Sequence, residues 1–240
     1  MLKKINIYGV RDSENLWFKN YLSDREQFVS INGIESGKQK MSCGVPQVLG
    51  PLLFLLFIND LPNATDFLTL LFADDTTFQV SDTDPNKLFN IANSELEKAS
   101  VWFSANKLTL NVKKTKFMLF SDKQFDIGNN KLQIGGTTIE QIGTHCQQKY
   151  FEFVGQVLDD KLTWEGQIEH ISKKLASANF AINSSKNFLP LSIRKTLYYS
   201  LFDSHINFGN LLWGCAKKKA LKKIENLQKK MHKICCPKKS

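Results

Sequence analysis

The sequence predicts an α+β fold, and three observations support this class. Short strand-forming runs, separated by turn residues, alternate with helical segments up to about residue 160. Beyond that point apolar residues recur at helical spacing, which predicts helices over residues 164–186, 192–207 and 219–234. We therefore expect two domains, an α+β body over residues 1–160 and a helical region with a basic tail over residues 161–240.

The first sixty residues contain candidate helices on either side of two candidate strands. Residues 16–22 have the pattern of a short amphipathic helix, and residues 27–32 and 39–42 have that of strands. Asn32-Gly33 supplies the turn after the first strand. Pro51 opens an apolar run over residues 52–61, and proline is preorganised for the first helical position. Because this run is apolar on nearly all sides, it predicts a buried helix.

Two adjacent carboxylates, Asp74 and Asp75, join two runs of apolar, β-branched and aromatic residues. Such runs are typical of strands, so their junction predicts a hairpin that holds both aspartates at a rigid bend. Aspartate is common at bends because its short side chain bonds nearby backbone. Without further context, a solvated turn is the simpler interpretation of the pair.

Asp84-Pro85 combines a capping residue with a helix-compatible proline, and helical spacing continues from there to Asn106. The segment that follows offers four further candidate strands, which we expect to form one sheet with the hairpin. These strands cover residues 108–111, 117–120, 132–134 and 150–158.

Composition indicates a folded intracellular protein. A hydrophobic content of 42% with 18 phenylalanines in 240 residues is typical of a globular chain. Five scattered cysteines without a Cys-x-x-Cys pair favour reduced thiols, so no disulfide partner is expected. The longest apolar run, residues 48–58, is broken by glycine and proline and falls short of the ~18 residues of a membrane span. We expect no signal peptide and no membrane association.

The excess positive charge is confined to the end of the chain. Residues 217–240 contain ten lysines and one glutamate, which equals the whole net charge of +9. The remaining 216 residues hold 22 basic and 22 acidic side chains. This segregation predicts a tail that faces a polyanion, although solubility or nuclear targeting would produce the same count.

A series of sequence blocks follows in order along the chain. The blocks are Cys43-Gly-Val-Pro-Gln47, residues 48–62, Leu71-Phe-Ala-Asp-Asp75, residues 105–111, Lys114-Thr115, Met118-Leu-Phe120, Phe153-Val-Gly155, Asp159, Leu162, Trp164, His170-Ile171, Tyr198, Trp213-Gly214 and Gln228-Lys-Lys230. In this order they resemble the reverse transcriptases of non-LTR retrotransposons, those of the jockey type above all. The match begins at Tyr8-Gly9 and runs to Ile234, and the succession of blocks is specific to that family.

The resemblance implies a palm-like sheet followed by a helical thumb, and RNA-directed DNA synthesis with an RNA template, a DNA primer and deoxynucleoside triphosphates. Nucleotide addition in that family uses two divalent ions, Mg²⁺ or Mn²⁺, which carboxylates hold. By resemblance Asp74 is the metal ligand of the pair, and Asp75 is a weaker or outer partner. Lys114 resembles the lysine that assists departure of pyrophosphate; its alternative is a solvated lysine at a strand edge.

Three further groups of residues acquire roles from the resemblance. The loop that contains Gly44, Pro46 and Gln47 would lie against the template and the incoming nucleotide, where a bare backbone permits close approach. The turn at residues 153–155 would hold the primer terminus, and its alternative is an ordinary apolar strand that ends in glycine. Nucleic-acid phosphates would be contacted by Lys217, Lys218, Lys219, Lys222 and Lys223.

Two departures from the family pattern lead us to expect an impaired enzyme fragment. An Asp-Phe-x-x-Ala-Phe-Asp block, which carries a further metal-binding aspartate in the family, does not occur in these 240 residues, and neither does the fingers region. The family's Gly-Ser pair after the glutamine is also absent, because Gln47 is followed directly by Val48. The alternative function is a non-catalytic nucleic-acid-binding remnant.

Overall fold

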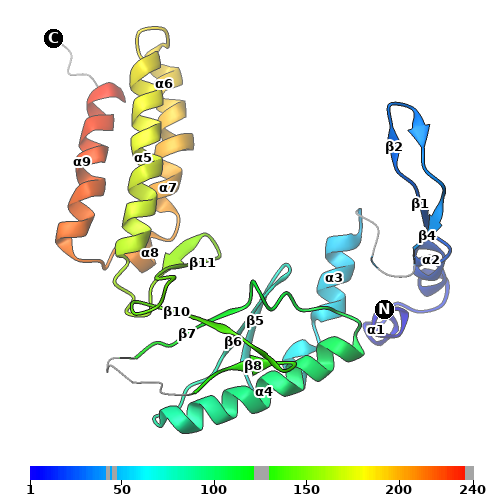
Figure 1. The fold of residues 1–240 in the computed structure, drawn as a ribbon. Helices are drawn as coiled ribbons and strands as arrows, with labels where there is room; N and C mark the ends of the chain where they lie inside the picture. The colour runs from blue at the N-terminus through cyan, green and yellow to red at the C-terminus, as the bar shows by residue number, and fades with distance from the viewer. Residues whose placement is uncertain (42–43, 45–47, 122–129, 236–240) are drawn as a thin grey trace. The chain divides into compact units, whose positions relative to one another are not determined.

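The structure is a computed structural model that describes residues 1–41, 44, 48–121 and 130–235 (Figure 1). The chain forms two compact units, unit 1 with residues 1–111 and 127–138, and unit 2 with residues 112–126 and 139–240. Helices and short strands occur in both units, so the α+β class is confirmed. The predicted boundary at residue 160, between an α+β body and a helical region, stays a prediction.

Unit 1 is built around a long helix and a β-hairpin. Its elements are α1 (Leu2–Ile7), α2 (Asp12–Leu22), β1 (Glu26–Gln27), β2 (Ser30–Ile31), β3 (Ile34–Glu35), β4 (Gln39–Lys40), α3 (Gly50–Ile58), the 3-10 helix η1 (Leu61–Ala64), β5 (Leu68–Phe72), β6 (Asp75–Gln79), α4 (Pro85–Ala105), β8 (Gln133–Ile134) and β9 (Thr137–Thr138).

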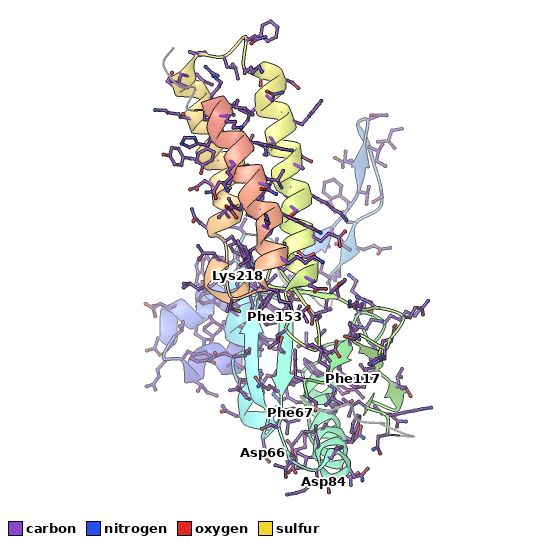
Figure 2. The ribbon with its side chains drawn as sticks, turned by 90° about the vertical axis from the view of Figure 1, so that its left-hand side faces the viewer. Asp66, Phe67, Asp84, Phe117, Phe153 and Lys218 are labelled. Atoms are coloured by element: carbon purple, nitrogen blue, oxygen red, sulfur yellow. The ribbon has the colours of Figure 1, made fainter. Side chains whose placement is uncertain are left out.

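The long helix α4 forms where the sequence predicts it. The Asp84 side chain, at the start of α4 in Figure 2, accepts a hydrogen bond of 2.9 Å from the Asn86 N–H, and Pro85 occupies the first turn. Buried residues recur at helical spacing and end with Ala99 and Phe103. Ala99 and Phe103 form a core with Ile58, and the hairpin of β5 and β6 packs against this core.

Helix α3 is less buried than its composition predicts. Leu53 and Ile58 are buried, but Leu52 and Leu55 are 54% and 46% exposed. The reason is that α3 packs on one side only, against α1 and the core beside α4. A fully buried helix was therefore the wrong expectation.

Lys4 ties α1 to α3 and α4. Its ammonium donates to the Phe57 carbonyl oxygen and to Asp60 Oδ1, each at 2.7 Å. The same ammonium lies 4.3 Å from the ring centre of Phe57 and 4.8 Å from that of Trp102. Hydrogen bonds and cation–π attraction thus act on one half-buried charge.

Unit 2 joins two small sheets to a helical bundle. Its elements are β7 (Lys116–Met118), β10 (Glu140–Ile142), β11 (Phe151–Phe153), β12 (Gln156–Leu158), α5 (Glu165–Ser185), α6 (Leu191–Tyr198), the π-helix η2 (Tyr199–Asp203), α7 (Ser204–Asn207), α8 (Asn210–Trp213) and α9 (Lys218–Cys235). The core of the bundle lies between α5 and α9, which run side by side (Figure 1), and includes Leu175, Ile182, Phe202 and Met231.

A buried carboxylate fixes the loop that leads into α5. Asp159, 2% exposed, accepts hydrogen bonds from the N–H groups of Lys161, Thr163 and Trp164 and from the Thr163 hydroxyl, at 2.9 to 3.2 Å. These bonds hold Trp164 in the left-handed region, with φ at 61°, directly before the helix. The polar groups of a sharp loop are thereby satisfied inside the protein.

The strands depart from the predicted single sheet. Among the described residues they pair only two by two: β1 with β4, β2 with β3, β5 with β6, β8 with β9, β7 with β10 and β11 with β12. Residues 108–111 form no strand. Leu108 and Leu110 instead pack against the core beside α4. The run 150–158 is a hairpin, not one strand.

Candidate active site and nucleic-acid interface

The hairpin β5–β6 positions the two aspartates differently. Phe72 pairs with Asp75, so Ala73 and Asp74 alone make the turn. Ala73 takes the left-handed conformation that such a tight turn requires, with φ at 51°. Asp74 therefore lies in the turn, whereas Asp75 begins β6. The expectation that both lie at the bend was correct for Asp74 only.

The β5–β6 hairpin is anchored to the rest of unit 1. Leu71 and Phe78 pack on the core beside α4, and the rings of Phe67 and Phe78 stack at 5.0 Å. The Asp66 N–H donates to Oε2 of Glu95 at 2.7 Å, and the Glu95 side chain is only 6% exposed. These contacts anchor the strands that carry the turn to the core beside α4.

Lys98 completes this attachment. Its ammonium donates to Glu95 at 2.7 Å and to Asp66 at 3.1 Å, and these two hydrogen bonds raise the pKa of Lys98. The buried carboxylate of Glu95 is therefore paired with a cation as well as with a backbone donor, as a buried charge requires.

Both aspartates are exposed, and their oxygens are the type of ligand that Mg²⁺ prefers. The structure gives neither carboxylate an ion pair with another described residue. In the described part of the chain, no three His, Cys, Asp or Glu side chains cluster in a way that could hold a metal. In general, carboxylates can share a Mg²⁺ ion with phosphate and water oxygens.

Lys114 lies in a turn that precedes β7, where the Thr115 N–H donates to the Val112 carbonyl oxygen at 3.2 Å. It belongs to unit 2, whereas the aspartates belong to unit 1. Its role beside them therefore stays a prediction. In the predicted nucleotide loop, Gly44 has φ at 93°, and Pro46 and Gln47 lie outside the described residues.

The predicted primer grip is a tight hairpin turn. Phe153 closes β11 and pairs with Gln156, and the turn residues Val154 and Gly155 have φ at 46° and 76°. Positive φ is rare for a β-branched residue and costs about 1–2 kcal/mol. A strained backbone that presents a side chain 40% exposed at a turn is the kind of feature found at functional sites.

Phe208, which directly follows α7, packs against this turn. A Cβ on Gly155 would lie 3.1 Å from Phe208 Cε1, so the turn packs directly on that ring. Behind it, Gln167 donates to Gln156 at 2.8 Å and accepts from the Val157 N–H at 2.8 Å. The residues that brace the turn were not identified from the sequence, because Phe208 and Gln167 belong to other elements that reach it only through tertiary packing.

Of the predicted phosphate-binding lysines, Lys217 directly precedes α9 and the other four lie on its solvent face. Its inner face packs on the bundle through Ile224, Met231 and Cys235. The lysines are exposed, and Figure 2 shows Lys218 where the helix begins. They form a cationic surface of the kind that contacts phosphates regardless of sequence, and they are Lys217, Lys218, Lys219, Lys222 and Lys223.

No helix in the described part of the chain is long and apolar enough to cross a membrane.

Comparisons with known proteins show which family the chain resembles. The family model described as reverse transcriptase (RNA-dependent DNA polymerase) matches residues 2–158. The RNA-directed DNA polymerase from mobile element jockey of Drosophila melanogaster is 27% identical over 88% of this chain, and the chain covers 24% of it. No solved structure matches the chain significantly.

Two further relatives are also proteins of Drosophila melanogaster. The probable RNA-directed DNA polymerase from transposon X-element is 24% identical over 90% of the chain, and that from transposon BS is 26% identical over 88%. The chain spans 24% of the length of each. The match of the family model over most of the chain, with relatives from non-LTR retrotransposons, confirms the resemblance: the chain belongs to the reverse transcriptase (RNA-dependent DNA polymerase) family.

Proposed function

We propose that this chain is the palm remnant and thumb of a non-LTR retrotransposon reverse transcriptase. Its substrates in the parent enzyme are an RNA template, a DNA primer and deoxynucleoside triphosphates. The observation that carries the proposal is the β5–β6 hairpin, whose two-residue turn presents Asp74 from a base anchored to α4. Residues 1–160 form the palm part and residues 161–240 the thumb.

Asp74 and Asp75 would hold the divalent ions, Mg²⁺ or Mn²⁺. When bound, such ions neutralise charge on the reacting phosphate and activate the primer hydroxyl in a two-metal nucleotidyl transfer. The protein's part is to keep the two carboxylates fixed and accessible, which the short turn and the buried Glu95 contact support. Lys114 assists departure of pyrophosphate.

The other predicted residues handle the nucleic acid. The loop with Gly44, Pro46 and Gln47 faces the template and nucleotide. The turn at residues 153–155 holds the primer terminus, a role that the strained and exposed Val154 supports. The lysines of α9 contact backbone phosphates.

Polymerisation by these 240 residues alone is negligible. They contain no Asp-Phe-x-x-Ala-Phe-Asp block and no Gly-Ser pair between Gln47 and Val48. Two carboxylates without a third leave the ions dependent on substrate oxygens. The test is extension of a labelled primer on an RNA template with Mg²⁺ or Mn²⁺. Extension that Asp74→Asn abolishes would show that the chain is an active polymerase after all.

The alternative function is a non-catalytic nucleic-acid-binding module. The exposed lysine face of α9 favours it, because a helix packed by its apolar face keeps the cations fixed toward solvent. Replacing Lys218, Lys219, Lys222 and Lys223 by glutamine should weaken duplex binding and flatten its salt dependence by about four slope units. Asp74→Asn, the matched control, should leave binding unchanged.

A further inference from the structure

A pair of buried amides lies beside the turn at residues 153–155. Gln167, the third residue of α5, is 1% exposed, and Gln156, the first residue of β12, is 6% exposed. Gln167 Nε2 donates to Gln156 Oε1 at 2.8 Å, and Gln167 Oε1 accepts from the Val157 N–H at 2.8 Å. One side chain of the helix therefore holds both the backbone and a side chain of the strand that leaves the turn.

The bond to Val157 takes the place of a further strand. Val157 pairs with Glu152 in the middle of the hairpin formed by β11 and β12, and no other described strand pairs with β12. The Val157 N–H donates outside this hairpin, to Gln167, and a buried backbone donor left without a partner is costly. Because an amide side chain presents the same C=O and N–H groups as a peptide, Gln167 extends the two-stranded ladder onto α5.

Gly209 closes the other side of the amide pair. A Cβ on Gly209 would lie 2.6 Å from Gln156 Nε2, so a side chain there would displace the amide. Gln156 Nε2 is buried and has no hydrogen-bond partner among the described residues. The Gln156 amide keeps this costly orientation because it presents its oxygen to the donor on Gln167.

These contacts join the turn to two other parts of unit 2. Gly155 packs on the ring of Phe208, and Gln156 is held by Gln167, while Val154 is left 40% exposed. The backbone at Val154 has φ at 46°, a strained conformation that persists only where surrounding contacts enforce it. The turn is therefore fixed relative to the start of α5.

We propose that Gln167 is a positioning residue, which holds the turn at residues 153–155 against α5 through Val157 and Gln156. The positioning role stands on these contacts alone, whereas its consequence for the primer rests on the proposed function. If the turn holds the primer terminus, the amide pair fixes that end relative to α5, the first helix of the thumb. Gln167 itself contacts no substrate, and the lysines of α9 hold the duplex independently of it.

The test compares variants of the full 240-residue chain. Gln167→Leu removes both hydrogen bonds. Gln167→Glu keeps both, because one oxygen accepts from Val157 and the other, protonated or not, meets the oxygen or the turned-over nitrogen of the Gln156 amide. Asn179→Leu is the matched control, since this amide of α5 donates to the Leu227 carbonyl oxygen at 3.1 Å and joins α5 to α9. If Gln167→Leu does not fold, Gln156→Leu, which removes only the bond between the two side chains, takes its place.

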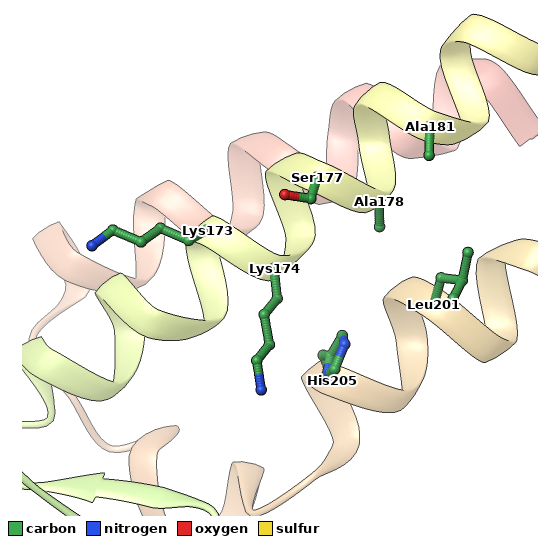
Figure 3. A pocket seen from close by; sticks show the side chains of 7 residues that line it. All are labelled: Lys173, Lys174, Ser177, Ala178, Ala181, Leu201 and His205. Atoms are coloured by element: carbon green, nitrogen blue, oxygen red, sulfur yellow. The ribbon is translucent and has the colours of Figure 1, made fainter. Parts of the chain in front are cut away.

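Two measurements are made on each variant. Backbone NMR order parameters at Val154 and Gly155 report the mobility of the turn within the folded chain, which a loss of global stability leaves unchanged. Fluorescence of 2-aminopurine as the terminal primer nucleotide on an RNA template reports whether the turn holds that end, and anisotropy reports total duplex binding. None of the substituted side chains lines the groove between α5 and the segment of η2 and α7, where Lys174 and His205 lie (Figure 3).

Gln167→Leu should lower the two order parameters from about 0.85 to below about 0.6, whereas Gln167→Glu and Asn179→Leu keep the wild-type values. It should also weaken the 2-aminopurine response severalfold at an unchanged duplex affinity and salt slope, because the lysines of α9 are untouched. Equal mobility of the turn in Gln167→Leu and in either of the other two variants would overturn the proposal.

The two measurements separate the positioning role from the proposed function. A turn that loosens in Gln167→Leu alone supports the positioning role whatever the primer does. If the wild-type chain then gives no 2-aminopurine response, the turn does not hold the primer terminus, and that part of the proposed function fails by itself.

Discussion

Asp159→Ala should destabilise unit 2 strongly, because a single buried carboxylate satisfies most of the loop that leads into α5. The side chain is 2% exposed and accepts from three backbone N–H groups and the Thr163 hydroxyl. Alanine removes every acceptor at once. The loop then loses the contacts that hold Trp164 at a φ of 61°.

The expected cost follows from which donors water can reach. Lys161 is exposed, so its N–H rehydrates at little cost, whereas Trp164 is 8% exposed and Thr163 is half-buried. An unsatisfied buried donor costs roughly 1–3 kcal/mol. Two such N–H groups therefore predict a loss of about 3 kcal/mol from the free energy of unfolding of unit 2.

Urea unfolding followed by tryptophan fluorescence measures this loss. Trp164 and Trp213 both lie in the core of the helical bundle. Replacing Trp17 and Trp102 of unit 1 by phenylalanine in all proteins compared limits the signal to unit 2. A change below about 1 kcal/mol would refute the reasoning, because it would mean that the donors find other partners.

The neighbouring Asp160→Ala provides the control for this experiment. Asp160 is half-buried and accepts from the N–H and hydroxyl of Thr144, at 2.8 and 2.5 Å. Its partners remain accessible to water, so its loss should cost about 1 kcal/mol. Equal effects of the two alanine variants would show that burial does not set the cost.

Three further predictions concern single side chains. Lys4→Met should lower the stability of unit 1 by about 2 kcal/mol in urea unfolding, because Phe57 and Asp60 lose their donor. Val154→Gly should raise the unfolding free energy of unit 2 by about 0.5–1 kcal/mol, since glycine accepts φ at 46° without strain. The lowered pKa of His205 contributes stability above pH 6.5 that is lost as the pH falls below that value, because the unfolded chain takes up the proton more readily. His205→Gln should therefore weaken the pH dependence of unfolding between about pH 7 and 5.

Each of these predictions has a contrary outcome. Lys3, an exposed neighbour on α1, is the control for Lys4, and an equal effect of Lys3→Met would remove the cation–π argument. Destabilisation by Val154→Gly would mean that the valine side chain contributes more than its strain costs. An unchanged pH profile in His205→Gln would assign the acid sensitivity to other groups.

Local signals in the sequence predicted the elements that depend on neighbouring residues. The cap at Asp84 and the helical spacing after it located α4 to within a residue or two. The runs on either side of Asp74 predicted β5–β6, although only pairing of Phe72 with Asp75 shows which aspartate makes the turn. Propensity assigns a turn but does not fix its register.

The same local signals did not predict contacts between segments that are distant in the sequence. Leu108 and Leu110 have a strand-like pattern, but their spacing reflects packing on a core formed by other elements. The cluster of Lys174 with His205 depends on how α5 meets α7, a matter of tertiary packing. The role of Asp159 is visible in the sequence only as a short acidic residue before a threonine and a tryptophan.

The two-residue turn between β5 and β6 makes this part of the chain sensitive to length. Side chains on a strand alternate between faces, so one residue inserted into β5 would exchange Leu71 with its exposed neighbour Leu70. The hairpin would then either expose its packed face or break the pairing of β5 with β6, in which Thr69 lies opposite Phe78. Substitutions at the exposed positions change chemistry alone, whereas a single insertion or deletion would separate the aspartates from the base that holds them. The hairpin therefore tolerates a change of residue type far better than a change of residue number.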